Sequence, residues 1–209
     1  MNIFFRFFYI FILGSVIGFI IETTWCIIKN KKVESRKGLI YGFFIPIYGV
    51  ATVLISYFYE ILNIRSSMVC FLLIFFICFF VEYLSSYLQE KLLGTKSWDY
   101  SKMKFNINGR VNLIYLLIWS ALGLLYCKYY NKIILTFASV FSSKRLFNIF
   151  TCLFIIFMIY DILISFFATY RQKKRNKGVQ ARNNIEKYLD NRYDDSYLNK
   201  IYANAVRIE

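Results

Sequence analysis

The sequence at residues 70–90 is CFLLIFFICFFVEYLSSYLQE, and its part from Cys70 to Val81 is too apolar to face water. The rest of the chain agrees, since 58% of its 209 residues are hydrophobic, 18% are charged and the mean hydropathy is +0.48. A soluble domain usually carries about 25% charged residues. The composition therefore excludes a soluble globular enzyme and indicates a membrane protein.

A helix needs about 20 apolar residues to cross a bilayer, and the sequence contains five candidates. They lie at about residues 4–28, 39–60, 68–90, 111–127 and 147–170. The sequence thus predicts an all-α, polytopic membrane helix bundle over residues 1–170, followed by a basic tail at 171–209. Residues 131–143 are apolar but too short to cross alone, so they are re-entrant, interfacial or a continuation of the fourth span.

Lys and Arg are distributed unevenly along the chain. Segments 29–38 and 91–110 carry five each and the tail carries ten, which together are 20 of the 26 basic residues. Because basic loops stay on the cytoplasmic side, we predict five spans with the N-terminus outside and the C-terminus in the cytoplasm. In a soluble protein the net charge of +14 would indicate nucleic-acid binding. Here it indicates topology and contact with membrane lipids, and we predict no nucleic-acid partner.

The tail has its own pattern. Its opening cluster RQKKRNK at residues 171–177 is suited to anionic headgroups. Apolar residues then recur at roughly helical spacing among charges, which favours a short amphipathic helix on the membrane or on the cytosolic loops. The alternative is a basic anchor followed by a loosely ordered tail.

No set of cofactor ligands stands out. The absence of histidine excludes His-ligated metals, His-ligated haem and a His general base. The five cysteines show no C-x-x-C spacing and lie mostly in apolar runs, which is typical of small buried hydrophobic residues. We therefore predict no cofactor and no metal, and we assign no catalytic residue.

Acidic residues lie inside three predicted spans, where a charged side chain costs about 2.5–3.5 kcal/mol at the helix centre. Glu22 is in the first span, Glu82 in the third and Asp161 near the centre of the fifth. In the third span Glu82, Ser86 and Glu90 are four residues apart and share one helix face. We expect these groups to face other helices or a water-filled cavity. The alternative is that they only hold the helices together by hydrogen bonds.

The loop after the third span supplies a second polar set, Trp98, Asp99, Tyr100, Asn106 and Arg110. We expect this loop to fold back onto the ends of the first and third spans. Arg110 should then lie within ion-pair reach of one of the carboxylates of Glu22, Glu82, Glu90 or Asp99. The alternative is that Trp98 and Tyr100 belong to an aromatic belt while Arg110 extends to the headgroups.

Pro46, the one proline of the chain, falls early in the predicted second span, close to Tyr48 and between Gly42 and Gly49. A proline inside a helix frees a backbone carbonyl and usually kinks the helix. The sequence therefore predicts a kink at Pro46 and Tyr48. Such a kink either contributes to a site at the middle of the membrane, as in transporters, or serves packing alone.

Five ordered motifs carry a family resemblance: Gly18-x-x-x-Glu22, Gly38-Leu39-x-x-Gly42-x-x-x-Pro46-Ile47-Tyr48-Gly49, Glu82-Tyr83-x-x-Ser86-x-x-x-Glu90, Trp98-Asp99-Tyr100-Ser101 and Asn106-x-x-Gly109-Arg110. Together they resemble the CmpB-like family of bacterial membrane proteins, described as putative ABC-transporter type IV or putative ABC transporter permease. The resemblance covers about residues 10–125, with a weaker echo at Asp161 and Ser165. The chain departs from the family pattern at Lys37, Phe43 and Ser97, where the family tends to have Arg, Pro and Trp.

The resemblance implies a permease-like subunit of an ABC-type transporter in the bacterial cytoplasmic membrane. The sequence has no G-x-x-x-x-G-K-[ST] phosphate loop, so the chain is not the ATPase. This hypothesis requires a separate ATPase subunit, and five spans favour a homodimer that encloses the pathway. Its polar pathway would be lined by Glu22, Glu82, Ser86 and Asp161.

Two other functions fit the same residues. One is an interfacial membrane enzyme that acts on a lipid or an envelope intermediate, because carboxylates with shifted pKa values can do acid–base chemistry without histidine. Its groups would be Glu90, Asp99, Asn106 and Arg110. The other is a small accessory or sensor protein whose polar residues only hold the bundle together.

Overall fold

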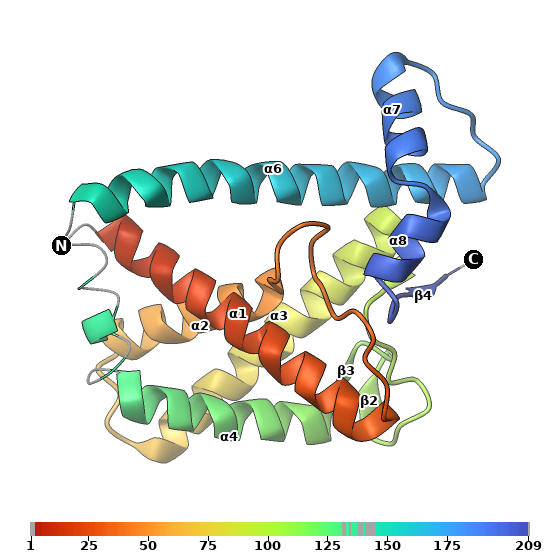
Figure 1. The fold of residues 1–209 in the computed structure, drawn as a ribbon. Helices are drawn as coiled ribbons and strands as arrows, with labels where there is room; N and C mark the ends of the chain where they lie inside the picture. The colour runs from red at the N-terminus through yellow and green to blue at the C-terminus, as the bar shows by residue number, and fades with distance from the viewer. Residues whose placement is uncertain (1–2, 131–132, 134, 138–139, 141–144, 209) are drawn as a thin grey trace.

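The computed structural model describes residues 3–130, 133, 135–137, 140 and 145–208 (Figure 1). Long apolar helices dominate this part of the chain: α1 (Ile3–Asn30), α3 (Ser67–Leu93) and α6 (Arg145–Asn176). Each contains a stretch long and apolar enough to cross a membrane. The predicted all-α membrane helix bundle is confirmed. Residues 131–143, for which the sequence leaves three placements open, lie largely outside the described residues.

Two further apolar helices are shorter, α2 (Pro46–Ile61) with 16 residues and α4 (Leu113–Tyr129) with 17. At 1.5 Å per residue they are about 24–26 Å long, below the hydrocarbon thickness of about 30 Å. Three of the five predicted spans therefore have a spanning length. The count of five and the orientation stay predictions.

The predicted kink at Pro46 is wrong, because this proline begins a helix. Helix α2 starts at Pro46, whereas the sequence predicted its start at residue 39. At the first helical position the missing N–H costs nothing, since the first N–H groups of any helix lack a partner within it. Residues 39–45 form a loop that leads into α2.

Small residues bring α1 and α2 into close contact. A Cβ at Gly18 would lie 2.3 Å from the Tyr48 ring, and one at Gly49 would lie 2.2 Å from Ser15 Oγ. Glycine at these positions lets the two backbones approach, as in many membrane helix pairs. The approach places Tyr48 directly against α1, one turn before Glu22.

The loop between α3 and α4 contains a small hairpin. Strands β2 (Asn106–Ile107) and β3 (Val111–Asn112) pair antiparallel. Asn108 and Gly109 have φ of 53° and 67°, and Arg110 N donates to Ile107 O at 3.0 Å. Positive φ at both central residues is what the type I′ turn requires. The hairpin returns the chain into α4.

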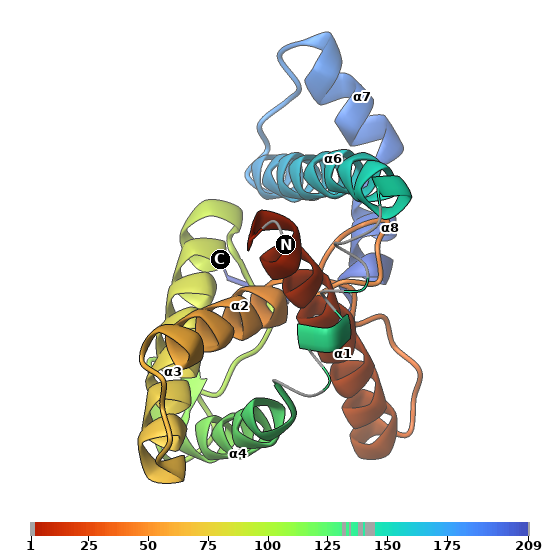
Figure 2. The ribbon, with the colours of Figure 1, turned by 90° about the vertical axis from the view of Figure 1, so that its left-hand side faces the viewer.

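The tail folds against the bundle and is not loosely ordered. Helix α6 continues through the predicted boundary at residue 170 and is followed by α7 (Asn184–Arg192) and α8 (Asp195–Ile201). Strand β4 (Val206–Arg207) then pairs antiparallel with β1 (Thr95–Lys96), at the end of α3. Tail residues Leu189, Tyr193 and Leu198 form a core with Ile40 and Ala168. Figures 1 and 2 show α6 along one side of α1–α4, with α7 projecting beyond it.

Candidate functional site

Four helices meet at what we term the polar centre, which consists of Glu22 on α1, Tyr48 on α2, Glu82 on α3 and Trp119 on α4. The Tyr48 hydroxyl donates to Glu22 Oε1 at 2.5 Å. The Tyr48 ring meets Trp119 edge-on with centroids 5.3 Å apart, and the Trp119 indole lies near the Glu82 carboxyl. All four side chains are partly exposed.

The polar centre is not fully satisfied. Within the described part of the chain, Glu82 Oε2 and Ser86 Oγ are buried and have no hydrogen-bond partner. Ser86 is only 1% exposed and lies one helical turn after Glu82. A buried polar atom without a partner costs about 1–3 kcal/mol, and more if it is charged. The sequence predicted that Glu22, Glu82 and Ser86 face the bundle interior, and the structure places Glu22 and Glu82 in one cluster.

Tyr100 covers the polar centre from the loop. Its ring stacks on Tyr115 of α4, with centroids 5.0 Å apart. Burial, followed by the charges of Glu82 and Glu22, raises the pKa of Tyr100 above its ordinary value. The phenol therefore stays protonated and available as a donor beside the two carboxylates.

Arg110 and Glu90 form an ion pair beside this cover. Arg110 Nη2 lies 2.5 Å from Glu90 Oε2, and Lys96 Nζ lies 3.4 Å from the same oxygen. The guanidinium also lies over the rings of Tyr83 and Tyr87, 5.7 and 5.5 Å from their centroids. Arg110 thus has the ion-pair contact that the sequence predicted, and it ties the hairpin to α3.

Trp98 also holds the hairpin, through a hydrogen bond from its indole Nε1 to Arg110 O at 2.7 Å. Asp99 and Asn106 shape the loop from within. Asp99 Oδ1 accepts from the Ser101 hydroxyl and backbone N–H, which lowers the pKa of Asp99. Asn106 Oδ1 accepts from Gly109 N at 2.8 Å. The structure does not bring Asp99 or Asn106 to the polar centre.

Asp161 occupies a different place. Its carboxylate is fully buried and accepts from the backbone N–H of Tyr41 at 3.1 Å and of Gly42 at 2.7 Å. Ser165, one turn later, donates to Asp161 Oδ1 at 3.2 Å and accepts from Ile40 N at 2.9 Å. Among the described residues, no hydrogen bond or ion pair joins Asp161 to Glu22 or Glu82. Asp161 anchors the loop before α2 to α6.

Two contributions escaped the sequence analysis. Glu60, at the end of α2, pairs with Arg6 of α1 at 2.7 Å and accepts a hydrogen bond from the buried Tyr130. The sequence did contain a signal for this pair, because Arg6 and Glu60 lie in two consecutive predicted spans, where an acid and a base are expected to pair. Trp119 was also missed, although an indole N–H within an apolar span needs a partner.

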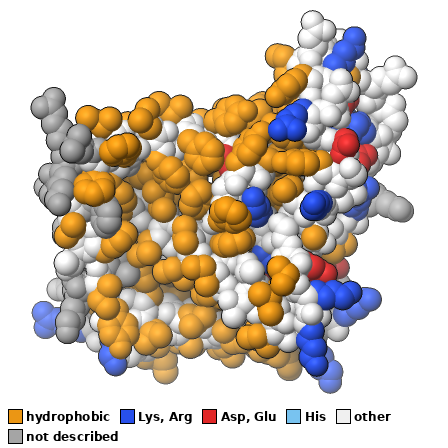
Figure 3. All heavy atoms as spheres, in the orientation of Figure 1, with side chains coloured by type: hydrophobic (Ala, Val, Ile, Leu, Met, Phe, Trp, Pro, Cys, Tyr) orange, Lys and Arg blue, Asp and Glu red, His pale blue; other side chains and the backbone are white. Residues whose placement is uncertain are grey.

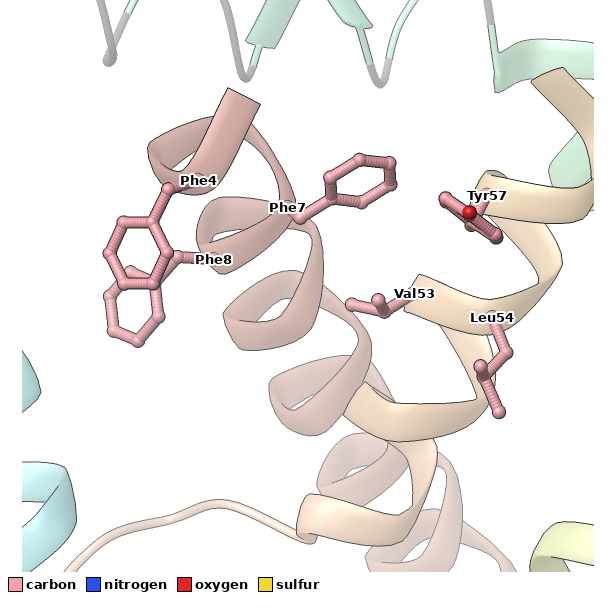
Figure 4. A pocket seen from close by; sticks show the side chains of 6 residues that line it. All are labelled: Phe4, Phe7, Phe8, Val53, Leu54 and Tyr57. Carbon is pink, nitrogen blue, oxygen red and sulfur yellow. The ribbon is translucent and has the colours of Figure 1, made fainter. Parts of the chain in front are cut away.

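An apolar groove lies between the start of α1 and the second half of α2, far along these helices from Glu22. Its lining is entirely hydrocarbon except for the Tyr57 hydroxyl, and consists of Phe4, Phe7, Phe8, Val53, Leu54 and Tyr57 (Figure 4). Such a lining offers no charged group and a single hydroxyl. The groove is therefore not the candidate site.

No curated protein and no solved structure matches the chain. The model of a family described as "Putative ABC-transporter type IV" matches residues 9–166, which include the polar centre, the hairpin and Asp161. The chain belongs to this family.

Proposed function

We propose that the protein is the permease subunit of an ABC transporter in the bacterial cytoplasmic membrane, and that the polar centre receives its solute or coupling ion. Membership of the family and the spanning helices support a transport role. The observation that carries the proposal is the buried Glu82 Oε2 without a partner among the described residues. An ionisable residue of this kind within a membrane protein is typical of a transport pathway.

The chemistry of the polar centre indicates what it would bind. Glu22 and Glu82 lie close enough to interact electrostatically, and two ionised carboxylates in a poorly solvated site would repel each other. A cation or a ligand rich in N–H and O–H groups would relieve this repulsion and supply the missing partner. Tyr48 and Trp119 would hold the two carboxylates in place.

The proposal requires partners. The sequence contains no phosphate loop, so a separate ATPase must supply the energy. A second copy of the chain would provide the further helices needed to enclose a pathway.

The interfacial-enzyme alternative has less support. Asp99 and Asn106 hydrogen-bond within their own loop, and Glu90 is paired with Arg110 and Lys96. These side chains already have structural partners, so few of their polar atoms are available for catalysis. The accessory-protein alternative predicts that neutralising the carboxylates changes stability only.

The test is purification of the full-length chain in mild detergent, followed by identification of bound proteins and assay of ATP hydrolysis in reconstituted vesicles. We expect a stoichiometric P-loop ATPase. Loss of one charged hydrogen-bonding group costs about 1.5–3 kcal/mol, so Glu82→Gln should lower hydrolysis by about 10–100-fold without loss of assembly. Glu34→Gln is the control, since Glu34 is a loop residue with its side chain 39% exposed. A complex without ATPase, or full activity of Glu82→Gln, would contradict the proposal.

A further inference from the structure

Helix α7 lies where α6 leaves its apolar segment. The apolar part of α6 ends at Tyr170, and the next residues bind α7 directly: Arg171 Nη2 lies 2.6 Å from Asp190 Oδ2, and Arg175 Nη1 lies 2.6 Å from Asp190 Oδ1. Figures 1 and 2 show α7 running across α6 and projecting sideways, away from α1–α4. If α6 crosses the bilayer, α7 therefore lies in the plane of the membrane at its surface.

The acidic residues of α7 face α6. Glu186 pairs with Lys174 and Arg171, both at 3.3 Å, while Asp190 pairs with the two arginines. Arg171 is only 2% exposed and cannot reach lipid headgroups, which corrects the expectation that the whole basic cluster rests on them. With its acids neutralised internally, α7 exposes only cations among its charged groups, Lys187 and Arg192.

The side of α7 that faces away from Glu186 and Asp190 exposes apolar side chains. Ile185 is 71% exposed and Tyr188 is 54% exposed, and with Arg192 they follow one stripe at i, i+3 and i+7. Asn184, Lys187 and Asn191 form the neighbouring stripe. Figure 3 shows hydrophobic side chains on the flank of the α7 projection that faces the apolar surface over α6. Exposed apolar residues, cations and this orientation are the properties of interfacial helices.

We propose that α7 is a membrane-surface helix that rests on the anionic headgroups of the leaflet where α6 ends. Ile185 and Tyr188 insert at the boundary between headgroups and acyl chains, while Lys187 and Arg192 contact lipid phosphates. The positive charge and the sideways projection favour an anionic bilayer over a protein partner, which would approach from beyond the membrane surface. The ion pairs of Arg171 and Arg175 fix α7 at this depth.

The test uses the full-length chain with its native cysteines replaced and a spin label at Tyr188→Cys, Ile185→Cys or Asn191→Cys. The protein is reconstituted in vesicles of phosphatidylcholine with 30% phosphatidylglycerol, or of phosphatidylcholine alone. Accessibility to oxygen against a water-soluble nickel chelate reports the depth of each label. We expect labels at 185 and 188 to be deeper than the label at 191, which is the matched control on the neighbouring stripe.

Lys187→Gln and Arg192→Gln should each lower the equilibrium constant between membrane-bound and released α7 by about fivefold. This factor corresponds to about 1 kcal/mol per cation near an anionic membrane. The labels at 185 and 188 should become shallower in pure phosphatidylcholine. Equal nickel accessibility at 185, 188 and 191 in both vesicles would overturn the proposal. Protection of 185 and 188 that appears only when an ATPase is added would also overturn it, and would identify α7 as a protein-docking helix. Two independent label sites keep the result decisive if one variant folds poorly.

Discussion

Asp161 on α6 and Glu82 on α3 each place a carboxylate within an apolar helix, but their surroundings differ. Both oxygens of Asp161 accept hydrogen bonds, from the N–H groups of Tyr41 and Gly42 and from Ser165. Glu82 has one buried oxygen without a partner in the described part of the chain, and it lies near a second carboxylate, Glu22. Both oxygens of Asp161 thus have partners, whereas one oxygen of Glu82 is left for another group to satisfy.

The difference separates structure from function among residues that look alike in the sequence. A carboxylate that receives backbone N–H groups stabilises the fold, because removing it leaves those donors unpaired. A carboxylate left bare destabilises the fold, and proteins keep such groups mainly at functional sites. We therefore assign Asp161 to the scaffold and propose a functional role for Glu82.

The largest effect on stability should come from Asp161→Ala. The substitution leaves the N–H groups of Tyr41 and Gly42 buried without an acceptor, which should cost about 2–4 kcal/mol. Thermal unfolding of the purified protein in detergent measures it. If Asp161→Ala unfolds at the temperature of the unsubstituted chain, the scaffold role is lost.

Arg110→Ala should have a smaller effect, about 1–2 kcal/mol, because its ion pair with Glu90 is half-buried. It should also lower activity, since it releases the hairpin, whose Gly109 O accepts a hydrogen bond from the backbone N–H of Tyr100 beside the polar centre. Lys102→Ala is the control, because Lys102 is exposed in the same loop. Equal activity of the two variants would show that the hairpin does not support the site.

Low pH should loosen the tail, which packs against Ile40 and Ala168. Burial opposes ionisation of Asp190, but hydrogen bonds from Arg171 and Arg175 lower its pKa below the usual value of 3.8. A carboxyl with a lowered folded-state pKa stabilises the fold above its unfolded pKa and loses that contribution as the pH falls further. Amide hydrogen exchange in α7, corrected for the intrinsic exchange rate at each pH, should therefore stay slow at pH 6 and become faster below about pH 4. Unchanged protection of the tail at pH 3 would contradict the ion-pair account.

Topology labelling is not expected to affect stability, but it locates Asp161 and Glu82 relative to the two sides of the membrane. In a cysteine-free background, a membrane-impermeant thiol reagent should reach Ser66→Cys from outside sealed cells and should miss Ser35→Cys and Lys102→Cys. The charge distribution of 20 basic residues against 6 is the reason. Labelling of Ser35→Cys from outside would place the loop anchored by Asp161 on the opposite side and refute the predicted orientation.

The sequence predicts what depends on local pattern. Apolar runs locate α1, α3, α4 and α6 to within a few residues, apart from the extension of α6 to Asn176. The cost of an unpaired arginine indicates an acidic partner for Arg110.

The rest depends on contacts between distant segments. The donors to Asp161 are backbone N–H groups about 120 residues away, and every residue except proline carries such a group, so the sequence gives no signal for them. Strand β4 has two residues and pairs with a strand of two, too few for an alternating pattern. The predicted kink at Pro46 was wrong because the effect of a proline depends on where its helix begins. The apolar run continues across that boundary, so the sequence does not mark it.

The most direct test of the contrast compares Glu82→Gln with Asp161→Asn in one thermal-unfolding experiment. Each change replaces a carboxyl group with an amide and keeps the shape of the side chain. Asp161→Asn should lower the Tm by about 2–8 °C, the shift that corresponds to about 1–2 kcal/mol in a chain of this size, because an amide nitrogen cannot accept from a backbone N–H. We expect Glu82→Gln to unfold at the same temperature as the unsubstituted chain or higher. A loss of Tm in Glu82→Gln as large as in Asp161→Asn would contradict the assignment of Glu82 to function.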